Sequence, residues 1–399
     1  MERKKIFWLV AVSLILRLTF VLSLPPHLKF DDEFEYWRVA ENFLSGHGLV
    51  VNENWKAFRP PLYPLIISVL MACRGNLLAI RIFQAVVSTA TVVFIFWLGK
   101  RVFSSQVGQL AGWFSCGYPF FIFYTGFLLT ETVFIFLIVW SLWELVVMTE
   151  APDAFRAVRA GLALGLAGLC RPTMQAFVPL ALLLVWLSRQ RKWQEIKLLA
   201  ITAVLFGLVL LPWVIRNYLL LGRFVPGTTM GGWVFWEGNN LHSEGGPCRI
   251  FPEEVGKISE GERDKFLYRE TMKVIRENPR RYLWLLQNKF KRFWNVVPNA
   301  KEFVKPLYRA VSVFSFGVLV PFFVLGFWVS LAQRKAWLLH GVIIFFTLFH
   351  VIYLASIRYR VAVEPFVIIF SANGWFYLVA LVRETVKLRK KQTIRWAGE

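Results

Sequence analysis

The chain has 399 residues, of which 57% are hydrophobic, 17% aromatic and only 18% charged. This composition excludes an ordinary soluble protein and predicts an all-α polytopic membrane protein. Much of the net charge of +21 lies in short connections and tails beside apolar segments, where topology and anionic lipids explain it, so we expect no nucleic-acid partner.

About ten apolar segments are long enough to cross a bilayer when tilt is allowed for. They fall at residues 6–24, 77–98, 106–124, 129–148, 157–170, 174–188, 196–215, 308–330, 336–355 and 361–382. The fifth and sixth are short and separated by Arg171-Pro172, which predicts a tight helical hairpin. Another apolar piece, residues 62–73, is too short to cross, and we expect it to be an interfacial or re-entrant helix begun by Pro60-Pro61.

Lysines and arginines in the short connections give the orientation, because with ten spans these groups fall on one side, which must be cytoplasmic. The opposite, exoplasmic side then holds two substantial regions, residues 25–76 and 216–307. The chain is therefore divided into three parts. They are an N-terminal transmembrane module (1–215) containing the first exoplasmic loop (25–76), an exoplasmic region with short helices (216–307), and C-terminal transmembrane helices with a basic cytoplasmic tail (308–399).

The first exoplasmic loop places Asp31, Asp32, Glu33 and Glu35 directly after an apolar span. Acids this close to hydrocarbon are costly unless they bind or react with something. If the segment is helical, Asp32 shares a face with Glu35 and Tyr36. A carboxylate there could take a proton from an attacking hydroxyl or amine without a metal. The alternative is a solvated helix start where acids suit the helix dipole, which explains Asp31 or Glu33 but not the whole cluster.

Five arginines map to the same exoplasmic face, against the usual bias: Arg59, Arg171, Arg216, Arg358 and Arg360. Guanidinium groups bind phosphate through paired hydrogen bonds and keep their charge at any relevant pH. The pattern predicts a phosphate ligand at the bilayer surface, attached to a lipid tail. The alternative is that each arginine snorkels at a helix end or pairs with a local carboxylate, which explains any one of them better than all five.

Several other polar and aromatic residues are candidates for acceptor or sugar binding. Glu131 begins the fourth span, where it could orient an acceptor or support the first acid, or serve as a helix N-terminal charge beside the capping residue Thr130. Trp233 and Trp236 could stack on a sugar and Asn239 could bind its hydroxyls, although interfacial anchoring is the commoner role of tryptophan. The histidines and cysteines show no metal-ligand spacing, so no metal site is predicted; a divalent cation near the acids stays open.

The string Asp32-Glu33-x-x-Tyr36 after a first apolar span resembles the motif that opens the first exoplasmic loop of GT-C membrane glycosyltransferases. The likeness is to the family 39 type, which includes protein O-mannosyltransferases and lipid A aminoarabinose transferases. It continues in order through Arg59-Pro60-Pro61-Leu62-Tyr63-Pro64, Gly168-Leu169-Cys170-Arg171-Pro172, Pro212-Trp213-Val214-Ile215-Arg216-Asn217 and Arg358-Tyr359-Arg360. The resemblance covers most of the chain and implies a fold with exoplasmic juxtamembrane helices.

The resemblance implies a polyprenyl-phosphate sugar donor, attack with inversion at the anomeric carbon, and a lipid, glycan or protein acceptor at the exoplasmic face. Carried onto this sequence, Asp32 is the base and Glu33 its supporting acid, with Asp31 as a one-residue alternative. Arg59 stands where related enzymes carry a basic residue for the donor phosphate. No cofactor is required, and the sugar, hexose or pentose, is not specified.

Two other functions would use similar residues. A transporter or flippase of an anionic lipid-linked substrate would also need exoplasmic arginines, but would more naturally show charges near mid-membrane and paired repeats. A glycan ligase or polymerase that uses a lipid pyrophosphate donor would act on the same side of the membrane as the glycosyltransferase, with much of the same chemistry. The chain has no Asn-x-Ser/Thr sequon, which favours a prokaryotic inner or plasma membrane, with membrane lipids as its surroundings.

Overall fold

A computed structural model describes residues 2–188, 193–299 and 305–396. Helices in the N-terminal half are α1 (Glu2–Leu22), α2 (Asp31–Leu44), α3 (Leu62–Ala72), α4 (Leu77–Val102), α5 (Ser105–Cys116), α6 (Pro119–Phe123), α7 (Glu131–Glu150), α8 (Ala154–Cys170) and α9 (Thr173–Ser188). Those that follow are α10 (Trp193–Leu221), α11 (Gly231–Asn239), α12 (Glu260–Glu277), α13 (Pro279–Trp294), α14 (Pro306–Ser312), α15 (Val318–Val329), α16 (Trp337–Ile352), α17 (Ile357–Arg360) and α18 (Glu364–Trp396). The described residues form no strand, so the all-α class is confirmed.

Seven helical segments among the described residues are long and apolar enough to cross a membrane. They are Arg3–Leu22, Leu77–Val102, Glu131–Glu150, Ile196–Leu221, Pro306–Val329, Arg334–Ile352 and Glu364–Leu388, and they coincide with seven of the expected spans. The remaining three expected spans correspond to shorter helices. Two of these, α8 and α9, have 17 and 16 residues and form the hairpin predicted around Arg171-Pro172. The third expected span, residues 106–124, is interrupted.

The interruption lies between α5 and α6, beside a fully buried arginine of α1. Pro119 has no N–H for the carbonyl of Ser115, so the helix cannot continue through it. Arg17 donates to two carbonyls here, from Nη1 to that of Cys116 (2.9 Å) and from Nη2 to that of Ser115 (3.3 Å), which also accepts from the backbone N–H of Tyr118 (3.4 Å). Its Nε donates to Ser88 of α4 (2.8 Å), so one side chain joins three helices.

Replacing Arg17 with methionine is expected to lower the free energy of unfolding by about 1–3 kcal/mol, the cost of leaving the buried carbonyl of Cys116 without this donor. Thermal unfolding in detergent would measure the change. Arg3→Met, at the exposed start of the same helix, is the matched control and should leave the melting temperature almost unchanged. Equal melting temperatures for the two variants would contradict the role of Arg17.

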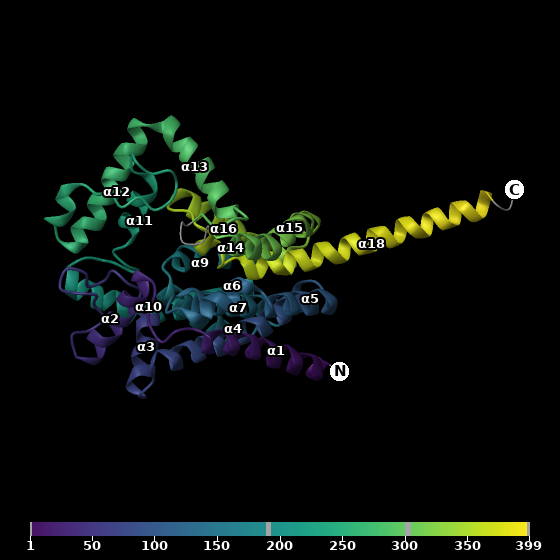
Figure 1. The fold of residues 1–399 in the computed structure, drawn as a ribbon, viewed down its shortest axis with the longest axis horizontal. Helices are drawn as coiled ribbons and strands as arrows, with labels where there is room; N and C mark the ends of the chain where they lie inside the picture. The colour runs from purple at the N-terminus through teal and green to yellow at the C-terminus, as the bar shows by residue number, and fades with distance from the viewer. Residues whose placement is uncertain (1, 189–192, 300–304, 397–399) are drawn as a thin grey trace.

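Residues 25–76 and 222–299 gather at one end of the molecule, opposite the two chain termini, and we call them the head (Figure 1). Glu260, at the start of α12, connects the two parts. Its carboxylate accepts hydrogen bonds from the backbone N–H of Lys56 (2.5 Å) and Ala57 (2.9 Å) and from the hydroxyl of Thr229 (2.5 Å). The guanidinium of Arg263 lies 4.3 Å from the ring centroid of Trp55. The two regions therefore contact each other at one end of the molecule.

Glu260→Gln is expected to loosen the first loop. The carboxylate of Glu260 accepts hydrogen bonds through both of its oxygens, whereas the neutral amide of glutamine has only one oxygen. Each hydrogen bond to a charged group contributes about 1.5–3 kcal/mol. Limited proteolysis should then cut residues 46–58 several-fold faster. Glu262→Gln, an exposed carboxylate on the same helix, should give the wild-type cleavage rate. Protection that does not differ between these variants would exclude Glu260 as the anchor.

Candidate active site

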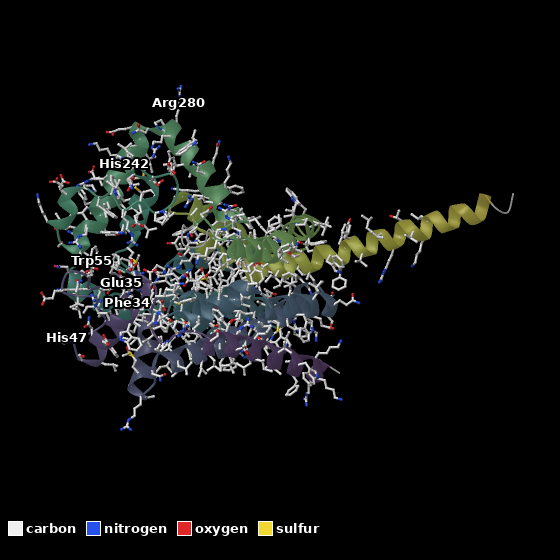
Figure 2. The ribbon with its side chains drawn as sticks, in the orientation of Figure 1. Phe34, Glu35, His47, Trp55, His242 and Arg280 are labelled. Carbon is white, nitrogen blue, oxygen red and sulfur yellow. The ribbon has the colours of Figure 1, made fainter. Side chains whose placement is uncertain are left out.

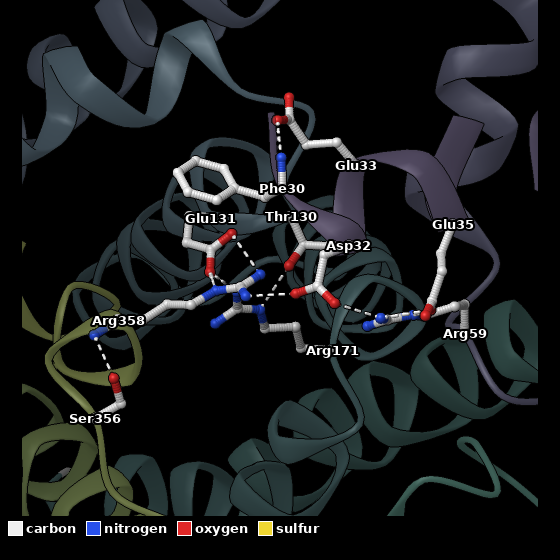
Figure 3. A network of polar contacts seen from close by, with 10 residues as sticks. All are labelled: Phe30, Asp32, Glu33, Glu35, Arg59, Thr130, Glu131, Arg171, Ser356 and Arg358. Atoms are coloured by element: carbon white, nitrogen blue, oxygen red, sulfur yellow. Dashed lines mark hydrogen bonds and ion pairs between the residues drawn. The ribbon is translucent and has the colours of Figure 1, made fainter. Parts of the chain in front are cut away.

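Two acids and three arginines from distant parts of the chain meet where the head joins the helical bundle (Figure 3). Asp32, at the start of α2, is held on both sides. Its Oδ1 accepts from Nη2 of Arg59 (2.5 Å), and its Oδ2 accepts from Nη1 of Arg358 (2.5 Å). Ser356, which caps α17, accepts a hydrogen bond from the backbone N–H of Arg358 and fixes that turn (3.3 Å).

Glu131, the first residue of α7, is the second acid and is 1% exposed. It pairs with Arg358 and with Nη2 of Arg171 (2.7 Å), so Arg358 bridges both acids. Thr130 does not cap α7 through its side chain; its hydroxyl accepts from Nε of Arg171 instead (2.9 Å). The interpretation of Glu131 as only a helix-end charge therefore does not describe its surroundings.

The first turns of α2 present one face to Arg59, as the helical spacing predicted. Nε of Arg59 donates to Glu35 (2.6 Å), and the guanidinium lies 5.0 Å from the ring centroid of Tyr36. Sequence reasoning gave Glu35 no separate role, although its position three residues after Asp32 was the available signal. Tyr36 is buried beneath the arginine and contributes to this face.

Glu33 does not lie beside Asp32, which corrects its expected role as the supporting acid. Its carboxylate is fully buried and accepts from the backbone N–H of Lys29 (2.8 Å), Phe30 (2.9 Å) and Leu128 (2.8 Å). It therefore positions the start of α2 against the chain segment that precedes α7. Figure 3 shows its carboxylate turned away from the arginine cluster.

The arginines control the charge state of Asp32. Burial alone would raise the pKa of Asp32, but Arg59 and Arg358 outweigh it, and the pKa falls below its ordinary value. Burial opposes the charge on Arg358, yet Glu131 and Asp32 hold the pKa of this arginine well above its ordinary value. Both side chains are therefore charged at neutral pH.

A cavity of about 410 Å³ opens beside these charges. Asp32, Arg358 and the exposed Asp31 line its polar part, while Phe120 and Tyr124 contribute to its apolar wall. The combination of a charged end and an apolar wall suits a molecule with an anionic head and a hydrocarbon tail.

Two of the five predicted phosphate-binding arginines make other contacts. Arg216 donates to the backbone carbonyls of Leu49 (2.8 Å) and Lys56 (2.7 Å), so it holds the first loop. Arg360 is fully buried, pairs with Glu364 (2.8 Å) and lies 3.5 Å from the ring centroid of Phe316. The structure brings Arg59, Arg171 and Arg358 together with the acids, but not Arg216 or Arg360.

The aromatic and amide residues expected to bind sugar pack within the head. Trp233 lies 3.9 Å between ring centroids from Phe251, and Nε1 of Trp236 donates to the carbonyl of Ile250 (2.7 Å). Asn239 is buried, donates to the carbonyl of Ile352 (3.2 Å) and accepts from Nζ of Lys289 (2.7 Å). None of the three predicted residues lines the cavity beside Asp32.

Lys289 is buried, and burial lowers its pKa to about 7. The unfolded chain therefore binds more protons than the folded chain between pH 7 and the ordinary pKa, so the free energy of unfolding should rise with pH across this window. We expect the melting temperature to increase from pH 7 to 9 in the wild type, and this slope to flatten in Lys289→Met. Lys291→Met, from the same helix, should keep the wild-type slope; a slope unchanged by Lys289→Met would contradict the assignment.

Among the described residues, no group of three or more His, Cys, Asp or Glu side chains could hold a metal ion. Both oxygens of Asp32 already accept hydrogen bonds from arginines. A divalent cation near the acids would therefore have to displace an arginine from Asp32.

Comparisons with known proteins bear on both the sequence and the fold. Residues 58–215 match the family model described as dolichyl-phosphate-mannose-protein mannosyltransferase. No curated protein matches the sequence.

Solved structures match almost the whole chain. The crystal structure of ArnT from Cupriavidus metallidurans bound to undecaprenyl phosphate matches with a TM-score of 0.58 and 16% identity, covering 92% of this chain and 59% of that chain. The crystal structure of the same protein in the apo state matches with a TM-score of 0.62 and 17% identity, covering 94% of this chain and 60% of that chain. A third match is the archaeal oligosaccharyltransferase AglB from Archaeoglobus fulgidus in complex with an inhibitory peptide and a dolichol-phosphate. Its TM-score is 0.58 and its sequence identity 14%, and the match covers 98% of this chain and 52% of that chain. The chain thus spans little more than half the length of these proteins, and the resemblance to the GT-C fold is confirmed.

Proposed function

Because the chain shares the GT-C fold with these membrane proteins, we propose that it is a glycosyltransferase that moves a sugar from a polyprenyl-phosphate donor to an acceptor. The observation that carries the proposal is the ionised carboxylate of Asp32, held between Arg59 and Arg358 at the polar end of an apolar-walled cavity. The undecaprenyl phosphate of ArnT and the dolichol-phosphate of AglB support a lipid-phosphate donor. The acceptor is a lipid, a glycan or a protein.

In the proposed reaction Asp32 removes the proton of the acceptor as the acceptor attacks the anomeric carbon. The new bond forms on the face opposite the phosphate, the bond from carbon to phosphate oxygen breaks, and the polyprenyl phosphate leaves with the electron pair. Arg358, with Arg59 and Arg171 nearby, offsets the charge that grows on the leaving group.

Arg358, which pairs with both Asp32 and Glu131, can control how strong a base Asp32 is. While Arg358 binds Asp32, it lowers the pKa of the carboxylate and weakens it as a base. If Arg358 turns toward the donor phosphate, Asp32 loses one of its two positive neighbours and its affinity for a proton rises. The donor would thereby activate the base that serves the acceptor.

We place the reaction at the exoplasmic face of a prokaryotic inner or plasma membrane. Support comes from the basic short connections, which the positive-inside rule assigns to the cytoplasm, and from the lack of a glycosylation sequon. The head, which carries Asp32, lies at the end of the bundle opposite the two chain termini (Figure 1).

Purified protein incubated with a panel of polyprenyl-monophosphate sugars tests the proposal. The wild type should consume one donor and release polyprenyl phosphate, and Asp32→Asn should not. Consumption of pyrophosphate-linked glycans alone would identify a ligase or polymerase. Movement of an intact lipid-linked substrate across vesicles without its consumption would identify a flippase.

A further inference from the structure

A second and larger cavity, of about 930 Å³, lies on another side of the first loop. We call it the loop groove: one wall is formed by the end of α2 and residues 46–56, and the other by the last turns of α10. It shares no lining residue with the cavity beside Asp32. Arg38 follows Asp32 by six positions on α2, about 9 Å along the helix, so the two cavities lie near opposite ends of that helix.

The loop-side wall of this groove is basic. Arg38, His47 and Lys56 line it, against a single acid, Glu53. Arg216, from α10 on the other side, donates to the carbonyls of Leu49 and Lys56 and so joins the two walls. Within the described residues, the side chains of Arg38 and Lys56 make no hydrogen bond or ion pair, so their donors are available to a ligand.

Apart from Arg216, the opposite wall of the groove is apolar, and it belongs to a helix that is long enough to cross a membrane. Pro212, Ile215, Leu219 and Leu220 supply it. Ile215 is 50% and Leu219 76% exposed, although both lie on this apolar helix. A residue exposed in this way on a membrane span is expected to contact hydrocarbon.

We propose that the loop groove binds a membrane lipid with an anionic phosphate headgroup. The phosphate lies between Arg38 and Lys56, and an acyl chain follows Ile215 and Leu219 down α10. Basic side chains next to an apolar span attract anionic lipids, and an amphiphile satisfies both walls at once. A soluble anion would leave the apolar wall uncovered, and a neutral lipid would leave the basic wall without a counter-charge. The site does not depend on the proposed transferase activity.

Native mass spectrometry of the detergent-solubilised protein, titrated with phosphatidylglycerol or phosphatidylcholine, tests this site. The wild type should retain phosphatidylglycerol preferentially. The double variant Arg38→Gln/Lys56→Gln should weaken that binding roughly five- to twentyfold, since each basic group near a lipid surface contributes substantially to anionic-lipid affinity.

The charge-matched control is Lys273→Gln/Arg280→Gln, which removes two exposed cations that do not line the groove. Figure 2 shows Arg280 at the far part of the head. This control should bind phosphatidylglycerol as the wild type does. Leu219→Ser should weaken lipid binding without changing the charge, and Asp32→Asn should leave it unchanged even though that variant is expected to lose transfer. Equal losses in both double variants, equal retention of phosphatidylcholine, or full displacement of the lipid by millimolar inorganic phosphate would overturn the proposal.

Discussion

Replacing Asp32 with asparagine is expected to lower the rate of sugar transfer by at least about 100-fold, because a positioned general base contributes about 10²–10⁴-fold. Asparagine fills nearly the same volume but cannot take the acceptor proton. Donor consumption by purified protein, measured at saturating donor, gives the rate.

Asp31→Asn is the matched control, since Asp31 lines the same cavity but is exposed and contacts neither arginine in the structure. It should transfer sugar within a few-fold of the wild-type rate. If Asp31→Asn loses activity and Asp32→Asn retains it, the base is Asp31.

The lowered pKa of Asp32 also predicts how kcat/KM, which reports on the free enzyme, responds to acid. A carboxyl group whose pKa is depressed on folding stays ionised down to below its ordinary range, so protonation of Asp32 should not reduce kcat/KM between pH 7 and about 5. The stability that its arginine contacts contribute is present above the unfolded-state pKa and is lost only as the pH falls toward the folded-state value.

Replacing Glu131 with alanine is expected to destabilise the protein by about 3 kcal/mol, because it leaves the largely buried Arg171 and the partly exposed Arg358 without their shared carboxylate. Transfer should be lost as well, since Arg171 and Arg358 would no longer be held together where they are proposed to offset the charge on the leaving phosphate. Thermal unfolding in detergent and the donor-consumption assay measure the two effects.

The size of the stability loss in Glu131→Ala shows whether Glu131 holds the two arginines or is only a helix N-terminal charge. A charge of that kind contributes only about 0.3–1 kcal/mol. Glu150→Ala, at the opposite end of α7, removes a partly exposed partner of Arg101 and serves as the control. It should cost less than about 1 kcal/mol. If the two variants cost the same, Glu131 does not hold the arginine cluster together.

The sequence was sufficient to predict the apolar helices and the shared face of Asp32, Glu35 and Tyr36, because both follow from local periodicity. It also placed Arg59, Arg171 and Arg358 on one face, since topology depends on the order of spans and loops. It could not predict that Arg216 is occupied elsewhere, because the loop carbonyls that Arg216 binds become its neighbours only after distant segments pack. Glu364, in contrast, stands four residues after Arg360, so the sequence already contained the signal for that pair.

The interrupted span at residues 106–124 and the position of Glu33 also differ from the prediction, because both depend on contacts with distant parts of the chain. The segment expected to span at 106–124 is apolar throughout much of its length, and its break depends on Pro119 together with Arg17, about 100 positions earlier. Glu33 stands next to Asp32 in sequence, but adjacent positions on a helix point in different directions. Two of its backbone donors, Lys29 and Phe30, precede α2 and the third, Leu128, precedes α7, and hydropathy carries no signal for them.

The separation of Asp32 and Arg358 along the chain has a consequence for how the protein is made. Asp32 and Arg59 emerge from the ribosome early, and Glu131 and Arg171 follow, so each acid meets an arginine while the C-terminal helices are still unsynthesised. Arg358 joins both pairs last, 326 residues after Asp32. A nascent chain that stalls before this point can insert its first helices with its charges paired and remain inert. Catalytic competence would then be acquired in a single step of biogenesis, when Arg358 reaches the two pairs that are already formed.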